Sequence, residues 1–388
     1  MTEKLYYIDS HMKSFTARVI SCEQAGERFE IILDRTAFFP EGGGQAGDTG
    51  CIGDIRVLDT REKNGKVVHY VNQAAEPGRE YDCMIDWEQR FRRMQNHSGE
   101  HIVSGIVHER WGYNNVGFHM GSEFVTIDFD GDLSADELRE VEREANRRVA
   151  ANLKIITSFP DAETLKTLQY RSKLELTENV RIVEIEGTDK CACCAPHVYS
   201  TAEVGIVKIL ASERRRRGGE GVRVTMLCGL DAYENLSRTH DNNAAISVLL
   251  SAKREETAAA VERILSEQEK LRARIIGLSA ALAKSKADAI EETDGNVCVF
   301  DDLLDEAALR EIVNAAVEKC GGIACVFSGS DENGYRYIIG SRSIDLRART
   351  KEINTGIGGR GGGRPEMIQG SCSASAKKIA EFVKNFVA

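Results

Sequence analysis

The sequence predicts an α+β fold built from several domains. Three observations predict it. Short β-rich segments recur at regular intervals over residues 1–88, helical periodicity begins near Trp87, and strand-like and helical patterns alternate after residue 295. A chain of 388 residues is long enough for two or three domains, and a hydrophobic content of 42% suffices for packed cores.

A small β-barrel is expected over residues 1–88. Five β-rich segments follow one another there at a spacing typical of such barrels. They are 15–22, 28–33, 51–58, 67–71 and 81–85. The region also holds a glycine-rich stretch, in which Gly42, Gly43 and Gly44 precede Gln45. Three glycines let the backbone approach a ligand closely, although a simple turn between strands would have the same composition.

A helix is expected to begin near Trp87 and to carry His97 and His101. Residues four apart lie on one face of a helix, so two imidazoles there can bind one ion. Much later in the chain, Cys193 and His197 repeat this spacing. Three nitrogens and a thiolate suit Zn²⁺, which prefers tetrahedral coordination. The alternative is four unrelated residues, because a single His-x-x-x-His is common by chance.

Two neighbouring cysteines, Cys191 and Cys194, are rivals of Cys193 as a ligand. Glu100 lies next to His101 and could polarise a water molecule or support an imidazole. The alternative for Glu100 is an ordinary exposed helix glutamate.

Residues 89–230 are expected to form an α+β domain around these residues. The segment Ser134–Glu137 is a capping box, in which side chains satisfy the first free amides of a helix. Apolar residues at helical spacing follow and should face the core: Leu138, Val141, Ala145 and Val149. Strands are expected at 180–186, 204–211 and 222–228. The metal-binding set would then lie at a junction between helix and sheet.

Residues 231–290 are expected to form a helical arm. Apolar residues there alternate steps of three and four, with one polar interruption, as in a heptad seam. The seam consists of Val261, Ile264, Gln268, Leu271, Ile275, Leu278 and Leu282. Such an arm could join two copies of the chain, while a plain amphipathic helix packed on a domain is the alternative.

Residues 291–388 are expected to form a separate α/β domain. Strand-like segments at 297–300 and 323–327 flank a helix at 305–319, and a last helix is expected at 374–387.

The net charge of −10 disfavours nucleic acid as a partner for the chain as a whole. Basic residues nevertheless gather locally, at Arg90, Arg92 and Arg93, at 214–217, and along 335–364. Three such clusters favour contacts with a nucleic-acid backbone, although each alone could be a solvated face.

The sequence favours a cytoplasmic location. Eleven cysteines at irregular spacing are typical of reduced thiols in a cytosol. No run of 18 apolar residues exists, and the first ten residues lack the pattern of a secretory signal.

The order of the motifs resembles a known family. Gly43-Gly44-Gln45, the two early histidines and the Cys193–His197 pair follow one another as in the editing domain of alanyl-tRNA synthetase and the free-standing AlaX proteins. Gly361–Met367 reads Gly-Gly-Gly-Arg-Pro-Glu-Met and is similar to the glycine-rich signature of the C-terminal (DHHA1-like) domain of those synthetases. The chain therefore resembles the long form of AlaX.

The resemblance implies an ester hydrolase that acts in translation fidelity. It would remove serine, with glycine as a secondary candidate, from tRNA for alanine in trans, with Zn²⁺ as cofactor. The resemblance also assigns functional roles to the matching residues of this chain. The metal ligands would be His97, His101, Cys193 and His197; Thr36, Gln45 and Glu100 would serve recognition and catalysis; Arg360, Gly361, Gly362, Gly363 and Arg364 would bind tRNA.

Two features separate this chain from its apparent relatives. Cys194, Ala195 and Pro196 stand where the family has Gly-Gly-Thr. Synthetases of the family bind nucleotide and ATP and have ligase activity, but editing motifs that begin by residue 36 leave no room here for an aminoacylation domain.

Two other functions remain open: a zinc-stabilised tRNA-binding module without hydrolysis, and a phosphoesterase-related protein. The second would need an Asp-His-His motif, which the sequence lacks.

Overall fold

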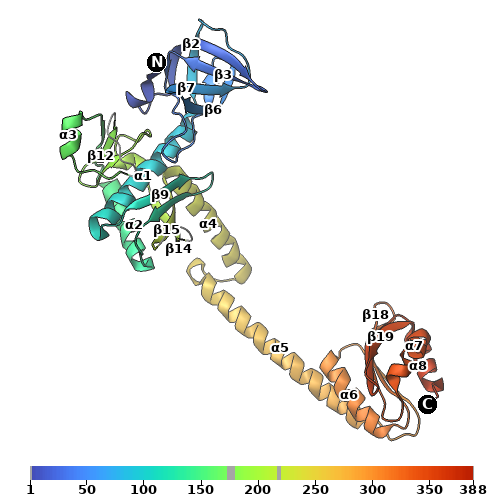
Figure 1. Ribbon diagram of the computed structural model, residues 1–388. Coiled ribbons are helices and arrows are strands. Elements are labelled where there is room, and N and C mark those ends of the chain that lie inside the picture. Colours follow the sequence, from blue (N-terminus) through green and yellow to red (C-terminus); the bar gives the residue numbers. More distant parts are fainter. Residues whose placement is uncertain (1, 173–179, 216–219, 388) are drawn as a thin grey trace. The chain divides into compact units, whose positions relative to one another are not determined.

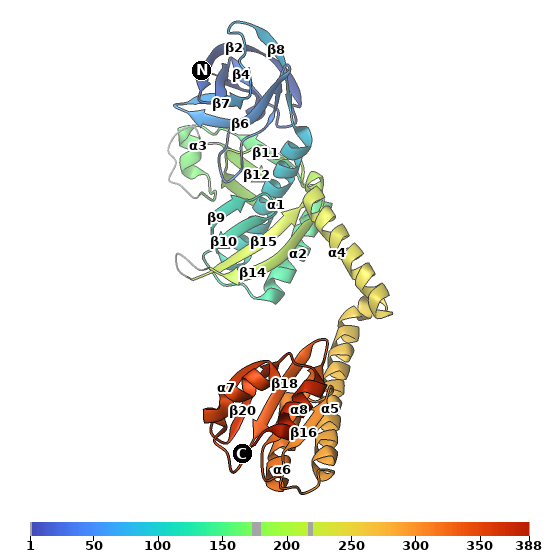
Figure 2. The ribbon, with the colours of Figure 1, turned by 90° about the vertical axis from the view of Figure 1, so that its right-hand side faces the viewer.

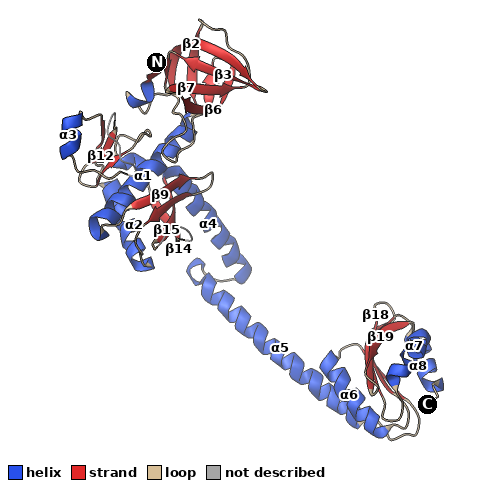
Figure 3. Cartoon of the chain, viewed as in Figure 1, coloured by secondary structure: helices blue, strands red, loops and turns tan. Residues whose placement is uncertain are grey.

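The computed structural model describes residues 2–172, 180–215 and 220–387, and the chain divides into two compact units, 1–244 and 245–388. Each unit contains both helices and β-sheet, so the predicted α+β class is confirmed (Figure 3). Within the described ranges, none of the helices combines the length and the apolar character that a membrane crossing requires.

The first unit begins with a closed barrel of six antiparallel strands in the order β2-β3-β7-β6-β5-β8 (Figure 1). The strands are β2 Ser14–Ala25, β3 Arg28–Leu33, β5 Gly50–Ile52, β6 Ile55–Lys63, β7 Lys66–Val71 and β8 Glu80–Ile85. Its core contains Ile31, Leu33 and Val57, which are fully buried. The expected single strand at 51–58 is wrong: a turn at residues 53–54 divides it into β5 and β6.

A short parallel pair lies beside the barrel. It consists of β1 Glu3–Lys4 and β4 Arg35–Thr36, and the 3-10 helix Leu5–Tyr7 follows β1. The glycine-rich stretch connects β4 to β5, at one end of the barrel.

Helix α1, Trp87–Trp111, follows the barrel and confirms the predicted helix. It contacts helix α2 and two sheets (Figure 2). The residues from Met94 to Val107 are therefore buried. Helix α2, Ala135–Ala150, begins at the predicted capping box, and its four predicted core residues are buried. Burial of α1 on nearly every side explains why it carries polar residues in the interior: they have partners on the surrounding elements.

The sheets around α1 hold three and four strands. The larger one has the order β14-β15-β10-β9, and the smaller one β11-β12-β13. The strands are β9 Asn115–Met120, β10 Val125–Phe129, β11 Ile155–Ser158, β12 Ile182–Ile185, β13 Asp189–Ala192, β14 Val207–Arg214 and β15 Val222–Cys228. The short helix α3, Ala162–Thr167, and the 3-10 helix Thr201–Val204 complete this part. The predicted strands at 180–186, 204–211 and 222–228 correspond to β12, β14 and β15.

Helix α4, Gly229–Leu250, leaves the first unit, and helix α5, Thr257–Asp288, follows after the 3-10 helix Arg254–Glu256. The predicted apolar seam on α5 is exposed over most of its length; Ile275 is 65% exposed. At its end, Leu282 and Ala283 pack against helix α6, Glu306–Lys319.

The second unit is a five-stranded sheet between two layers of helices. The strands are β16 Val297–Asp301, β17 Ala324–Ser330, β18 Gly334–Gly340, β19 Gly359–Gly363 and β20 Met367–Cys372, in the order β16-β17-β18-β20-β19. Only β16 and β17 pair in parallel. Helices α5 and α6 cover one face, and α7 Leu346–Ile357 and α8 Ala376–Asn385 the other. The glycine-rich segment thus forms the edge hairpin β19–β20.

Candidate metal centre

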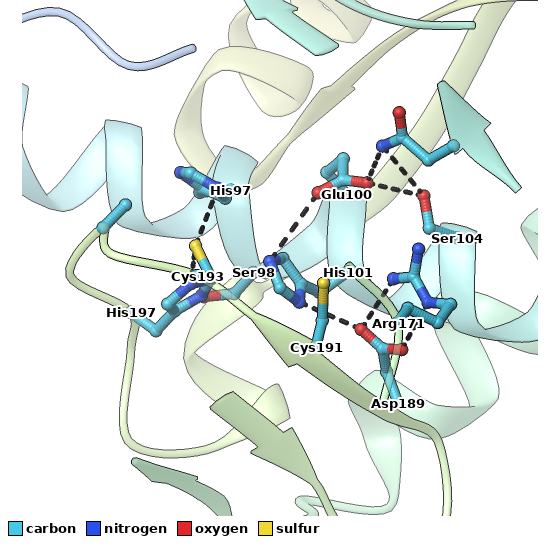
Figure 4. A network of polar contacts seen from close by, with 12 residues as sticks. His97, Ser98, Glu100, His101, Ser104, Arg171, Asp189, Cys191, Cys193 and His197 are labelled. Carbon is cyan, nitrogen blue, oxygen red and sulfur yellow. Dashed lines mark hydrogen bonds and ion pairs between the residues drawn. The ribbon is translucent and has the colours of Figure 1, made fainter. Parts of the chain in front are cut away.

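Four residues from two distant segments meet beside α1. His97 and His101 lie on the buried part of that helix, and Cys193 and His197 lie on the loop that follows β13 (Figure 4). One ligand atom from each of the four lies within 4.8 Å of the others. The ring centroid of His197 is 4.9 Å from that of His97 and 4.7 Å from that of His101. The structure therefore brings together the four residues that the spacing predicts.

Each histidine is held at Nδ1 by a different neighbour. His97 Nδ1 lies 3.1 Å from Gln45 Oε1, His101 Nδ1 2.9 Å from Asp189 Oδ2, and His197 Nδ1 3.0 Å from Ser98 Oγ. The Nε2 atoms of His97 and His197 lie 3.5 and 3.4 Å from Cys193 Sγ. A neighbour at Nδ1 fixes the ring and leaves the Nε2 lone pair for an ion, an arrangement typical of histidine ligands.

The buried charges favour a metal-binding state of Cys193. Burial would raise the pKa of its thiol, but His97 and His197 hold that pKa well below its ordinary value. Burial lowers the pKa of His197 to about 3. Thiolate and neutral imidazole are the forms that bind a metal ion.

Asp189 anchors the other side of the site. Its carboxylate accepts hydrogen bonds from Arg171 Nε and Nη2 at 2.7 and 2.8 Å and from His101. Although burial would raise the pKa of Asp189, these bonds lower it to about 2. For His101, burial would lower the pKa, but Asp189 and Cys193 raise it well above its ordinary value. Asp189 therefore holds the His101 ring through Nδ1, on the side away from Nε2.

Arg181 shapes the loop that carries Cys193. Its buried guanidinium donates from Nη1 to the carbonyl oxygens of Cys193 and Ala195, at 3.0 and 2.7 Å, and its own carbonyl accepts from the Cys193 amide. Of the rival cysteines, Cys194 is exposed outside the set, and Cys191 instead groups with His101 and Asp189. Three imidazoles and one thiolate, each oriented by a neighbour, fit Zn²⁺.

Glu100 is buried beside the site, so the alternative of an exposed helix glutamate is wrong. Its Oε1 accepts from Ser104 Oγ and from Asn115 Nδ2, both at 2.5 Å, and its Oε2 lies 3.8 Å from His101 Nε2. The carboxylate is thus held in place near the metal-binding atoms.

Gln45 reaches the site from the glycine-rich loop. Its side chain is buried, its Oε1 faces His97, and its Nε2 has no hydrogen-bond partner among the described residues. Gly44 makes the approach possible: its φ is +83°, and a Cβ there would lie 2.6 Å from the ring of Phe118. Beside Gln45 opens a groove of about 430 Å³, lined also by Gly44, Arg61 and His119.

Thr36 lies apart from this set. Its side chain is fully buried, at the β4 end of the loop. Its hydroxyl lies 2.9 Å from His69 Nε2 and accepts from the Phe38 amide at 3.1 Å. The structure therefore places Thr36 behind the loop that holds Gln45, and not among the residues that line the groove.

The cluster at Arg90, Arg92 and Arg93 was expected to favour nucleic-acid contacts, and this expectation is wrong for Arg90, which is fully buried, whereas Arg92 and Arg93 are partly exposed. Arg90 is fully buried and paired with Asp48, Arg92 is paired with Glu88, Asp231 and Glu234, and Arg93 donates to the Gly47 carbonyl at 2.8 Å. Of the second cluster, Arg216 and Arg217 lie outside the described residues.

The glycine-rich hairpin of the second unit is exposed from Arg360 to Arg364. Its glycines have a packing role: a Cβ at Gly361 would lie 2.4 Å from the hydroxyl oxygen of Tyr337. That hydroxyl donates to Asn354, whose amide donates to the Gly361 carbonyl.

Sequence patterns did not indicate several residues of the site: Ser98, Asn115, Arg171, Arg181 and Asp189. They are far from their partners in sequence, and ordinary polar residues carry no spacing signal. Only for Asp189 could the sequence have indicated a role in the site, because this residue closely precedes the cysteine cluster.

Comparison with known proteins agrees with this arrangement along the chain. The family model for "tRNA synthetases class II (A)" matches residues 3–89, the model for the "Threonyl and Alanyl tRNA synthetase second additional domain" matches residues 180–223, and the DHHA1 domain matches residues 294–388.

Similar curated proteins cover the whole chain. The alanyl-tRNA editing protein AlaX-L of Pyrococcus horikoshii is 26% identical over 98% of this chain and 96% of its own length. The alanyl-tRNA editing protein Aarsd1 of Mus musculus is 23% identical over 95% of this chain and 94% of its own. The alanine–tRNA ligase of Natronomonas pharaonis is 33% identical over 95% of this chain but only 42% of the ligase. The chain accordingly belongs with the AlaX-type alanyl-tRNA editing proteins, two of which it matches over 98% and 95% of its length.

Proposed function

We propose that this chain is an aminoacyl-tRNA editing hydrolase. It would cleave the ester of tRNA for alanine that carries serine, with glycine as a secondary substrate. The observation that supports this most is the set of three histidines and one cysteine, each histidine held at Nδ1, beside a buried amide and a buried carboxylate.

The donor set would hold Zn²⁺ through His97, His101, Cys193 and His197. When bound, the ion would polarise the substrate or a water molecule, or position them. Gln45 Nε2 would donate to the ester carbonyl oxygen as negative charge develops there, since this buried donor has no partner among the described residues. Glu100 Oε2 would accept a proton from the attacking water, in keeping with its position 3.8 Å from His101 Nε2.

Thr36 would distinguish serine from alanine. His69 Nδ1 lies 3.1 Å from the Ile31 carbonyl, and burial lowers the pKa of His69 to about 4. The neutral ring therefore donates from Nδ1 and accepts at Nε2, so that the Thr36 hydroxyl donates to His69. Since the Thr36 oxygen also accepts from Phe38, it would have one lone pair left for a hydroxyl of the substrate. Because the Thr36 side chain is fully buried behind the glycine-rich loop, this contact would require the loop to move when the substrate binds.

Deacylation assays test the proposal directly. Transfer RNA for alanine, charged with serine, glycine or alanine, is incubated with protein, with protein treated with chelator, and with His97→Ala. We expect rapid release of serine, slower release of glycine and little release of alanine, with all release lost after chelation and in His97→Ala. Equal rates with and without metal would contradict the proposed role of Zn²⁺.

A second function is a zinc-stabilised tRNA-binding module without hydrolysis. The specific observation in its favour is the number of protein donors: four ligands complete a tetrahedral shell, whereas catalytic zinc normally keeps one position open. Stoichiometric zinc and tight tRNA binding without ester cleavage would favour this function over the first.

Different parts of the chain would have different roles. Residues 1–88 and 89–230 would supply the chemistry, and residues 291–388 would bind the tRNA backbone through Arg360, Gly361–Gly363 and Arg364. Residues 231–290 would form an arm that pairs with a second copy of the chain.

A further inference from the structure

Three side chains of α1 contact the glycine-rich loop in register. Arg90 pairs with Asp48, Arg93 Nη1 donates to the Gly47 carbonyl, and His97 meets Gln45. Steps of three and four place these residues on one face of the helix. The loop therefore lies along the same face that carries the metal-binding histidines.

The contact between Asp48 and Arg90 is the most buried ion pair of this region. The side chains are 1% and 0% exposed. Arg90 also donates to the carbonyl oxygens of Ala37 and Ser10, at 2.6 and 3.2 Å. One guanidinium thus joins α1 to both sides of the loop and to the segment before it.

Asp48 also closes the base of the loop. Its Oδ2 accepts from the Phe39 amide at 2.6 Å, while its own amide donates to the Phe39 carbonyl at 2.8 Å. Its Oδ1 has no hydrogen-bond partner among the described residues and lies 3.8 Å from Arg93. Residues 39–48 therefore form a closed loop whose buried charged anchor is the Asp48–Arg90 pair, whereas the other ion pair of the loop, Glu41 with Arg61, is exposed.

We infer that Asp48 and Arg90 are positioning residues, which hold the loop so that Gln45 meets His97. This rests on the proposed function for its effect on catalysis, but the anchoring itself does not. A buried ion pair adds little net stability compared with apolar residues, and its best-attested use is to specify one arrangement. Here the arrangement that it specifies is the distance between an amide on a glycine-rich loop and a metal-binding ring on a helix.

Proteolysis tests the anchoring without reference to activity. Glu41 is exposed on the loop, so glutamyl endopeptidase can cleave after it once the loop leaves α1. We expect Asp48→Asn and Arg90→Lys to be cleaved there at least about ten-fold faster than the unaltered protein. Glu80→Gln removes an exposed carboxylate elsewhere on the barrel and should leave the cleavage rate unchanged. Equal cleavage of all four proteins would overturn the anchoring.

Kinetics on seryl-tRNA test whether the anchor acts through Gln45. Asp48→Asn should lower kcat about ten-fold, as loss of a neighbour of a metal ligand commonly does, with KM and zinc content within about two-fold of the unaltered protein. In a Gln45→Ala background the same change should cost nothing further. The same fractional loss in both backgrounds would overturn the inference.

Two further results separate the possible failures. If Asp48→Asn does not fold, Arg93→Gln removes the bond to Gly47 and the charge 3.8 Å from Asp48 Oδ1 but leaves the Asp48–Arg90 pair, so it should show a smaller loss with the same dependence on Gln45. If the unaltered protein releases no amino acid from any tRNA, the proposed function fails, while the proteolysis still decides the anchoring.

Discussion

Three chemically different groups hold the three histidines: an amide on His97, a carboxylate on His101 and a hydroxyl on His197. The carboxylate of Asp189 makes the His101 imidazole more basic, because it stabilises positive charge on the ring. The strength of each ligand is therefore set by a residue that would not itself touch the metal. The contribution of each neighbour to metal binding can therefore be tested by substituting that neighbour alone.

Asp189→Asn should weaken zinc binding about 10- to 100-fold, because His101 loses a charged acceptor and Arg171 loses its partner. Titration with a competing chelator measures this. Glu184→Gln on the neighbouring strand removes a more exposed carboxylate and serves as the control. An unchanged zinc affinity in Asp189→Asn would show that the carboxylate does not tune the site.

Thr36→Val keeps the shape of the side chain but removes its hydroxyl. His69 Nε2 and the Phe38 amide lose a partner, so the free energy of unfolding should fall by about 1–3 kcal/mol. If Thr36 selects serine, the ratio of seryl to alanyl hydrolysis should also fall about ten- to a hundred-fold, with zinc content unchanged. A fall in stability with an unchanged ratio would confine Thr36 to the support of the loop, and Gln45 would become the next candidate.

At the level of elements, helix α5 carries an apolar face that is largely exposed in the part of the chain that the structure describes. Ile264, Leu271 and Leu278 are 45%, 59% and 61% exposed, whereas the end of the seam packs on α6. Glu267 and Arg272 occupy the flanking heptad positions, where opposite charges from two parallel copies can pair. The face is thus suited to a second copy of the same helix.

We expect the chain to be a dimer in solution, measured by light scattering during gel filtration. Charges placed in the seam, as in Leu271→Glu with Ile275→Glu, should give a monomer, because the charges would be buried together. Ala273→Glu lies outside the seam on the same helix and should leave the dimer intact. A monomeric unaltered chain would contradict the proposed pairing.

Across the whole molecule, periodic patterns predicted elements and simple spacing predicted the metal set. The helix of His97 and His101, the capping box at Ser134 and the strands of the first 88 residues follow from local patterns. Burial of charged residues does not follow from such patterns. Arg90 and Arg93 read as a basic surface because their partners, Asp48 and Gly47, lie more than 40 residues away in sequence.

Other contacts of the site could not be predicted for the same reason, because they join residues that local patterns do not connect. Asp189 and Arg171 meet because Arg171 forms a parallel bridge with Cys191 of β13, and Arg181, which directly precedes β12 of the same small sheet, reaches the Cys193 loop. The division of 51–58 into two strands depends on a two-residue turn at Gly53 and Asp54, which lies between residues of high β-propensity. Sequence patterns therefore found the residues that would bind the ion, and missed those that hold them.

The two compact units allow the affinity for tRNA to be separated from the chemistry. Residues 1–244 contain the metal-binding set and two hydrophobic cores of their own, so this fragment should fold and retain its zinc. It should bind tRNA more weakly than the full chain, and its affinity should depend less on salt, because fewer phosphate contacts release fewer counterions. In the full chain, Arg360→Gln with Arg364→Gln should reduce the slope of log affinity against log salt by about 1.5, whereas Arg18→Gln on the barrel should not. If the fragment binds tRNA as tightly as the full chain at every salt concentration, the second unit has another role, and the exposed glycine hairpin would be explained by its packing against Tyr337 alone.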